Sequence, residues 1–234
     1  MSTEYADLAG ALRAAGIAGD LADRLAAYGA LLLEANRKVN LTGAKDAAAL
    51  VPHLLDALTL VDDVSESLAD VGSGGGLPGV PLAIATGARA LLVEPTAKKA
   101  AFLERVLREC GIPGHAVAER AEVVGRDAQF REQFAFATAR AVASAPTVAE
   151  LTVPFLRVGG RALLQRGAVE PRERQALEDA APMLGAALIE ERRLDGDRCI
   201  LILEKLRPTE QRFPRRNGVP EKRPLCYDPM SSRA

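Results

Sequence analysis

A glycine-rich segment, Asp70-Val-Gly-Ser-Gly-Gly-Gly-Leu-Pro-Gly79, is the part of the chain best suited to holding a ligand. Gly72, Gly74 and Gly76 can adopt backbone angles closed to other residues, and they leave no Cβ where a ligand approaches the main chain. Gly74, Gly76 and Gly79 also satisfy G-x-G-x-x-G, a spacing that binds nucleotides when it lies between a strand and a helix. A tight turn without a ligand would not need five glycines in eight residues, so we interpret the segment as a nucleotide-binding loop.

A carboxylate, Glu94, ends the next apolar run of the sequence, 22 residues after Gly72. A carboxylate at this place accepts hydrogen bonds from the ribose hydroxyls of a nucleoside. Nicotinamide cofactors and S-adenosylmethionine both carry that ribose. Asp70, directly before the loop, favours S-adenosylmethionine, because a carboxylate suits a cationic methionine end better than a pyrophosphate. The sequence also has no Tyr-x-x-x-Lys relay for hydride chemistry.

Short apolar runs alternating with helical segments position these residues. The runs that predict strands are 68–71, 90–93, 116–118, 134–139, 162–164, 186–194 and 198–204. Strand–helix alternation implies a parallel sheet, and Asp195-Gly196 between the last two runs is a hairpin signal. We therefore predict an α/β, Rossmann-like class I methyltransferase fold, with a seven-stranded, mostly parallel sheet that ends in an antiparallel hairpin.

The chain divides into three parts by pattern. Residues 1–63 are helical, with Leu21, Leu25, Tyr28 and Leu32 on one face of a helix that Asp20 could cap, and they form a predicted N-terminal helical cap. Residues 64–206 are the predicted S-adenosylmethionine-binding domain. Residues 207–234 form a basic, proline-rich tail, which we expect to be extended, because prolines exclude a helix or a central strand.

The composition excludes several classes of protein. The 234 residues are 48% apolar and 26% charged, as in folded globular domains, and no apolar run reaches the ~20 residues of a membrane span. Three scattered cysteines and two histidines argue against a disulfide scaffold and against zinc. The acidic N-terminus does not resemble a signal peptide. We expect a cytoplasmic monomer with neither a membrane nor a metal partner.

Charge is distributed unevenly along the chain. From Lys205 onward there are eight basic and three acidic residues, whereas the whole chain has a net charge of −1. A basic end on an acidic body suggests an anionic partner, although a solubilising tail would look the same. If the tail binds RNA, a chain ending at Leu206 should keep its cofactor and bind RNA more weakly.

Several motifs resemble the RsmG (GidB) family of bacterial 16S rRNA guanine-N7 methyltransferases. They are Asn40-Leu-Thr42, His53-Leu-Leu-Asp56, the glycine loop, Lys98-Lys99 with Phe102-Leu103, Thr138-Ala-Arg-Ala141, and Arg212-Phe-Pro-Arg-Arg-Asn-Gly-Val-Pro220. The similarity runs from about residue 20 to 225. The chain departs from the family's pattern at Ala139, where serine is frequent, and at Arg166-Gly167, where Lys-Gly is frequent.

The resemblance implies a role for individual residues. Gly72 and Leu77 would contact the methionine half of S-adenosylmethionine, and Thr96 would lie near the ribose held by Glu94. Ala121 and Glu122 would flank the adenine. Arg140 would lie beside the methyl-transfer centre, as the catalytic residue.

The RNA partner implied is 16S rRNA at its 530 loop, met as naked rRNA, the 30S subunit or its precursor. The basic residues expected to contact it are Lys98, Arg120, Arg166, Arg212, Arg215 and Arg216.

Guanine N7 is a lone-pair acceptor, so its methylation needs no general base. The sequence has no Pro-Cys nucleophile of the kind that cytosine C5 methylation uses, and no Asn/Asp-Pro-Pro-aromatic turn after the fourth predicted strand. Two alternatives stay open: a methyltransferase for another substrate on the same fold, and a ribosome-assembly factor that binds RNA and retains the cofactor loop without turnover.

Overall fold

The computed structural model describes residues 2–140 and 143–227. The chain divides into two compact units, residues 1–118 and 119–234. This division differs from the three parts expected from the sequence pattern, which stay a prediction.

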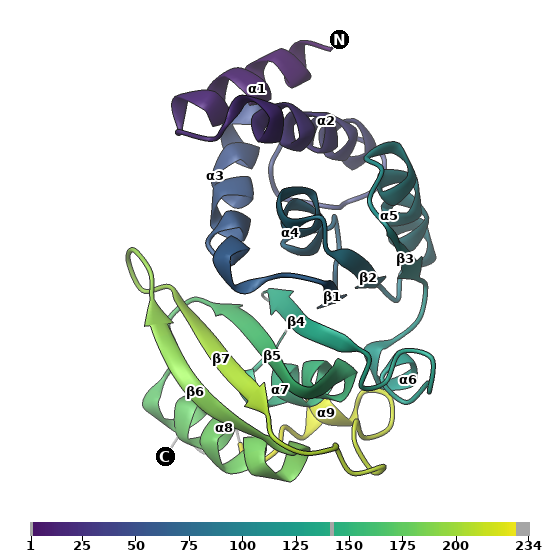
Figure 1. The fold of residues 1–234 in the computed structure, drawn as a ribbon, viewed down its shortest axis with the longest axis vertical. Helices are drawn as coiled ribbons and strands as arrows, with labels where there is room; N and C mark the ends of the chain where they lie inside the picture. The colour runs from purple at the N-terminus through teal and green to yellow at the C-terminus, as the bar shows by residue number, and fades with distance from the viewer. Residues whose placement is uncertain (1, 141–142, 228–234) are drawn as a thin grey trace. The chain divides into compact units, whose positions relative to one another are not determined.

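The first unit carries three parallel strands and the helices around them (Figure 1). Its strands are β1 (Ser67–Val71), β2 (Arg89–Val93) and β3 (Gly114–Val117), with β2 paired to both of the others. Its helices are α1 (Thr3–Ala14), α2 (Gly19–Asn36), α3 (Ala47–Leu58), α4 (Gly79–Thr86) and α5 (Ala97–Glu109), with a 3-10 turn at Val61–Asp63.

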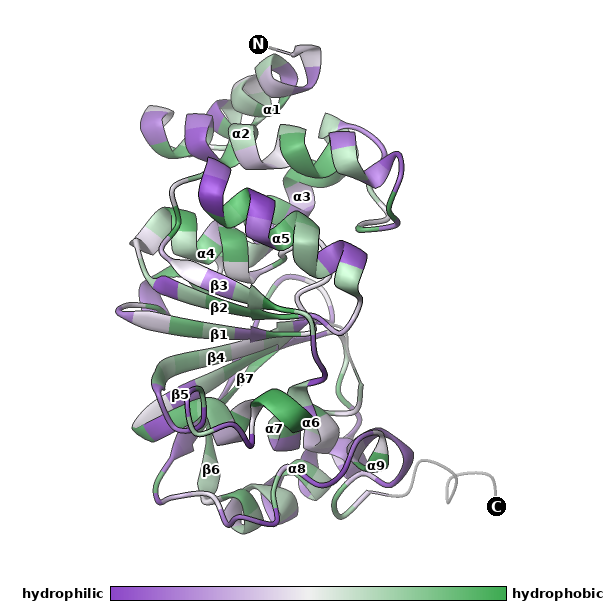
Figure 2. Cartoon of the chain, turned by 90° about the vertical axis from the view of Figure 1, so that its right-hand side faces the viewer, coloured by the Kyte–Doolittle hydropathy of each residue, from purple (hydrophilic) through white to green (hydrophobic). Residues whose placement is uncertain are grey.

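One hydrophobic core joins these elements. Helix α4 contacts β1 and β2, and α2 and α3 contact α4 in turn. Tyr28 of α2, Val80 of α4 and Leu103 of α5 are all fully buried in this core. Figure 2 shows hydrophilic and hydrophobic bands alternating along α5, as expected of a helix with one face buried.

The ends of the helices follow local sequence signals in part. Asp46 caps α3, because its carboxylate accepts a hydrogen bond from the amide of Ala49 at 2.9 Å. The cap expected of Asp20 is wrong: α2 begins at Gly19 after Ala18, and Asp20 lies in the first turn. A carboxylate there still stabilises the helix through its dipole.

The second unit carries the remaining strands. They are β4 (Phe134–Arg140), β5 (Leu156–Arg166), β6 (Ala186–Arg193) and β7 (Cys199–Lys205). Its helices are α6 (Ala121–Val124), α7 (Ala145–Thr152), α8 (Pro171–Leu184) and α9 (Val219–Lys222), with a 3-10 turn at Val153–Phe155. Strand β5 pairs parallel to β4 and antiparallel to β7, and β7 pairs antiparallel to β6.

The sheet has the strand order β3-β2-β1-β4-β5-β7-β6. The predicted seven strands and the terminal antiparallel hairpin are therefore confirmed. Strand β5 is longer than its predicted apolar run because the buried Leu156 at its start is followed by three exposed residues, Arg157, Val158 and Gly159, which carry no burial signal.

The described part of the tail, residues 207–227, is hydrogen-bonded to other residues of the second unit. The extended segment expected from the sequence is not what the structure has: much of residues 207–227 forms turns and bends, and the segment contains the short helix α9. Pro220 lies in the first turn of α9, where the missing amide hydrogen of proline costs no hydrogen bond.

Candidate cofactor-binding site

The glycine loop joins β1 to α4 and is fixed to the end of β2. The amides of Gly72 and Ser73 donate to the carbonyl oxygen of Val93 at 2.9 and 3.1 Å. Gly72, Gly74 and Gly76 have φ angles of 72°, 56° and 101°, in the left-handed region that strains every residue with a side chain. The loop conformation therefore depends on glycine at these three positions.

Glycine at positions 75 and 76 lets the loop lie directly on the core. The hydroxyl of Tyr28 donates to the carbonyl oxygen of Gly75 at 2.8 Å, and both groups are buried. A Cβ on Gly75 would lie 2.9 Å from Leu32 Cδ1, and one on Gly76 would lie 2.7 Å from Val80 Cγ2. These two glycines therefore serve packing on the underside of the loop.

Gly74 is different, because a Cβ there would meet no atom closer than 3.9 Å. Its amide donates to Glu94 Oε2 at 3.0 Å, and Glu94 Oε1 accepts from the amide of Thr96 at 2.9 Å. Glu94 is 5% exposed. Each carboxylate oxygen has a second lone pair, so Glu94 can still accept hydrogen bonds from two ribose hydroxyls. Gly74, Glu94 and Thr96, expected from the sequence to share a site, lie together in the structure.

Asp70 lies beneath the start of α4. It is 1% exposed, and its Oδ2 accepts from the amide of Gly79 at 3.3 Å. A Cβ on Gly79 would lie 2.6 Å from Asp70 Cβ, so glycine is needed for this approach. The side chain of Leu77 is buried in the hydrophobic core. Contacts of Asp70 and Leu77 with the methionine end of a cofactor stay predictions.

In the second unit, Ala121 and Glu122 begin α6 and are both buried. Glu122 Oε1 accepts from the amide of Gly218 at 2.7 Å and from Arg120 Nη2 at 3.3 Å. The sequence did not indicate that the tail reaches this carboxylate.

Arg140, the predicted catalytic residue, is the last residue of β4 and is half-buried. It lies opposite Gln165 of β5. The next residue, Ala141, which completes the family motif, lies outside the described residues.

The basic residues expected to bind RNA fall into two groups. Lys98 and Arg216 are exposed, and the side chain of Arg212, which stacks over the ring of Phe213 at 4.9 Å, is 62% exposed. Arg120 is partly exposed and pairs with Glu122.

Arg166 and Arg215 instead pair with buried carboxylates. Arg166 Nη2 lies 2.8 Å from Glu173 Oε1, and Nη1 donates to the carbonyl oxygen of Ala143. Arg215 forms a forked ion pair with Glu150, which is fully buried. The side chains of Arg166 and Arg215 are only 14% and 25% exposed, so the more exposed arginines are better placed to neutralise phosphates, and RNA contacts by Arg166 and Arg215 stay predictions.

Metal and thiol chemistry find little support in the described residues. No group of three or more His, Cys, Asp or Glu side chains among residues 2–140 and 143–227 could hold a metal ion. In the same residues, every helix is too short or too polar to cross a membrane. Burial raises the pKa of the Cys110 and Cys199 thiols, which keeps them protonated and poorly nucleophilic.

The fold and the loop define a class of protein. A parallel sheet continued by an antiparallel hairpin, with a glycine loop after β1 and an acidic residue after β2, is the class I S-adenosylmethionine-dependent methyltransferase fold. A geranyl diphosphate methyltransferase solved with S-adenosylmethionine has this fold. It is 17% identical, with a TM-score of 0.53, over 74% of this chain and 95% of that chain.

The sequence places the chain within this class. The sequence model of the GidB family, described as rRNA small subunit methyltransferase G, matches residues 22–197. The ribosomal RNA small subunit methyltransferase G of Rubrobacter xylanophilus is 43% identical over 84% of this chain and 81% of that protein. The enzyme of the same name from Carboxydothermus hydrogenoformans is 39% identical over 85% of this chain and 89% of that protein. This chain belongs to the GidB family of S-adenosylmethionine-dependent methyltransferases.

Proposed function

We propose that this chain methylates N7 of a guanine in the 530 loop of 16S ribosomal RNA. It would act as a cytoplasmic monomer without a metal ion, on the 30S subunit, its precursor or naked rRNA. The observation that carries the proposal is the hydrogen bond from Gly74 to Glu94, which joins an open glycine loop to a ribose-binding carboxylate in a GidB-family chain.

The residues present fit S-adenosylmethionine. The open side of the loop at Gly74 leaves the main chain accessible, and Glu94 keeps free lone pairs for the ribose. By family resemblance, Leu77 and Thr96 complete the methionine and ribose contacts, and Ala121 and Glu122 flank the adenine. When bound, S-adenosylmethionine supplies an electrophilic methyl group on a sulfonium ion.

Guanine N7 suits a site without a general base. Its lone pair is unprotonated at neutral pH and faces the major groove, so the chain has only to orient it.

Arg140 would orient the guanine. Its planar, forked guanidinium can donate to the O6 atom of the base or to a flanking phosphate.

Other basic residues would contact the RNA phosphates: Lys98, Arg120, Arg212 and Arg216. With aromatics at only 4% of the chain, recognition of RNA shape and phosphates is expected in place of base stacking.

Transfer of tritiated methyl groups from S-adenosylmethionine tests the proposal, with 30S subunits, naked 16S rRNA and 50S subunits as acceptors. We expect label in 16S rRNA only, and we expect Arg140→Lys to lower turnover far more than cofactor affinity. Arg193→Lys, an exposed arginine of β6, is the matched control. Binding of 30S subunits without transfer would favour an assembly factor, and labelling of a different substrate would assign the fold to other chemistry.

A further inference from the structure

The two adjacent arginines of the tail point to different tasks. Arg216 is exposed, whereas the side chain of Arg215 is 25% exposed and pairs with Glu150, a carboxylate of α7 with no exposed surface. Arg215 donates to Glu150 through its own amide at 2.7 Å, through Nε at 2.9 Å and through Nη2 at 2.6 Å. A carboxylate this deeply buried needs such a partner, since an unpaired charge there is strongly destabilising.

This ion pair sets where the next residues of the tail lie. Arg215 Nη2 also donates to the carbonyl oxygen of Arg223 at 2.8 Å, which closes the segment 215–223 into a loop. Midway along this segment, the carbonyl oxygen of Pro220 accepts a hydrogen bond from Oγ1 of Thr147, a residue of α7, at 2.9 Å. The segment is therefore held at both ends and in the middle by polar contacts with α7 or within itself.

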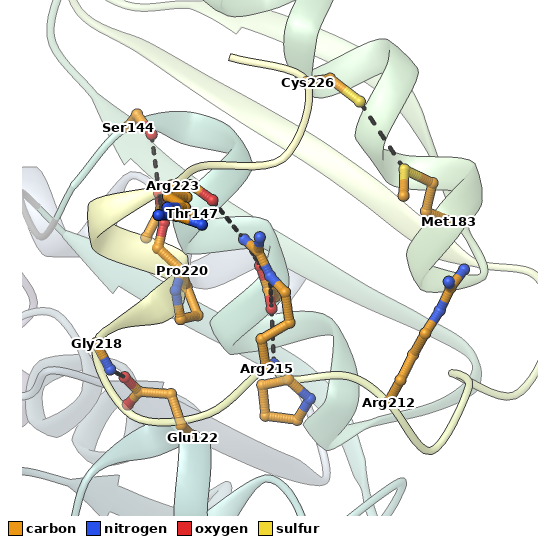
Figure 3. A network of polar contacts seen from close by, with 12 residues as sticks. Glu122, Ser144, Thr147, Met183, Arg212, Arg215, Gly218, Pro220, Arg223 and Cys226 are labelled. Carbon is orange, nitrogen blue, oxygen red and sulfur yellow. Dashed lines mark hydrogen bonds and ion pairs between the residues drawn. The ribbon is translucent and has the colours of Figure 1, made fainter. Parts of the chain in front are cut away.

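Gly218 lies within this closed segment and meets Glu122. Its φ of 73° is in the left-handed region, and its amide donates to Glu122 Oε1 at 2.7 Å (Figure 3). Glu122 is 4% exposed, and the only other donor recorded for that oxygen in the described residues is Arg120, at 3.3 Å. The shorter of the two contacts therefore comes from the tail.

We propose that Arg215 is a positioning residue: with Glu150 it holds Gly218 against Glu122, and so fixes the carboxylate that faces the adenine of S-adenosylmethionine. We call the Arg215–Glu150 ion pair and the Gly218–Glu122 hydrogen bond together the tail latch. The inference rests on the proposed cofactor role of Glu122. It assigns the tail to cofactor binding as well as to RNA. It therefore replaces the expectation from the sequence that a chain ending at Leu206 keeps its cofactor, and predicts that such a chain loses cofactor affinity.

Calorimetric titration of the full-length protein with S-adenosylmethionine tests the tail latch. We expect Arg215→Ala to raise the Kd about tenfold, a coupling of ordinary size, and Arg216→Ala to leave it within about twofold. Both variants lose one positive charge from neighbouring positions, so a general charge effect would change them equally. Arg215→Lys, which keeps the charge opposite Glu150, should restore part of the affinity.

A destabilised control separates positioning from a general loss of stability. Leu177→Ala removes a fully buried side chain of α8 that takes no part in the tail latch. It should lower the melting temperature and leave the Kd of the folded protein unchanged. If Arg215→Ala and Arg216→Ala show the same Kd as the wild type, the inference is wrong although the proposed function stands. If the wild type itself does not bind, the proposed function and the inference fail together.

Hydrogen exchange on the wild type gives a second test that does not depend on whether Arg215→Ala folds. Coupling is reciprocal, so bound S-adenosylmethionine should slow exchange of the Arg215 and Gly218 amides by a similar, about tenfold, factor. Peptides from β6, which have no part in the tail latch, serve as the internal reference. Unchanged exchange across residues 215–222 on saturation with S-adenosylmethionine would overturn the inference.

Discussion

The carboxylate of Glu94 accepts a hydrogen bond from the amide of Gly74 at 3.0 Å, across 20 residues of sequence. The end of β2 and the glycine loop after β1 are therefore coupled in the protein alone. A carboxylate held in this way is oriented before a ribose arrives, which lowers the entropic cost of binding.

Gly74→Val should abolish binding of S-adenosylmethionine while the chain stays folded. The branched side chain would fill the open side of the loop and would be strained at a φ of 56°. Gly87→Val is the matched control, since Gly87 also has a positive φ with free space around it but lies at the other end of α4. Near-normal affinity of Gly74→Val by calorimetry would contradict the proposed site.

Glu94→Ala should weaken S-adenosylmethionine binding by about 1–3 kcal/mol, because the ribose hydroxyls would lose their acceptors. Glu94→Gln keeps one acceptor oxygen and should lose less. Calorimetric titration of both variants with S-adenosylmethionine gives the order of their affinities. A dissociation constant that neither substitution changes would show that Glu94 only fixes the loop.

Arg216→Ala and Arg212→Ala should each reduce the salt dependence of RNA binding. Removing one phosphate contact lowers the slope of log K against log salt by roughly 0.7–0.9. Filter binding of each variant to 16S rRNA at several salt concentrations measures this slope. These exposed residues are better probes than a chain ending at Leu206, which would leave Glu150 unpaired. Slopes equal to that of the wild type would remove both arginines from the RNA-binding surface.

Glu132 should make the second unit sensitive to acid. Burial acts to raise its pKa, but hydrogen bonds from Lys205 and the Thr209 amide, with nearby positive charges, hold it below the ordinary value of 4.5. The folded state therefore binds fewer protons than the unfolded state, and stability from Glu132 is complete above about pH 4.5 and is lost as the pH falls through the lower folded value.

Glu132→Gln should cost about 3 kcal/mol of unfolding free energy at pH 7, because Lys205, which is fully buried, loses its counter-charge. The difference from the wild type should shrink as the pH falls below 4. Urea unfolding at pH 7 and below pH 4 measures this difference in unfolding free energy. Glu178→Gln, from a more exposed ion pair, is the control. A difference independent of pH would mean that Glu132 is not charged in the folded protein.

The sequence was a good guide wherever a signal is local. The buried parallel strands were predictable because they read as continuous apolar runs, and the last two strands because Asp195-Gly196 is a hairpin signal. The glycine loop was recognisable from its position after the first strand. The pairing of Glu94 with the loop followed from the meeting of strand ends at one edge of the sheet.

Contacts between distant residues could not be predicted in the same way. Arg215 and Glu150 lie 65 positions apart, and nothing in either residue type reveals that one charge is buried and the other meets it. The tail was therefore interpreted by its net charge, its prolines and its family motif, and its contacts with α7 were not foreseen. Tyr28 was recognised only as one apolar position on a helix face, because a helical period shows burial and does not show that the hydroxyl supports Gly75.

The most direct test of the central claim is the identity of the methylated nucleoside. Purified protein, S-adenosylmethionine and 30S subunits from a strain that lacks this activity would be incubated, and the rRNA digested to nucleosides for mass spectrometry. The account predicts 7-methylguanosine from a single site in the 530 loop, with a single-turnover rate that is nearly flat above about pH 6, since no general base is required. A different methylated nucleoside, or a rate that rises tenfold per pH unit through neutrality, would contradict it.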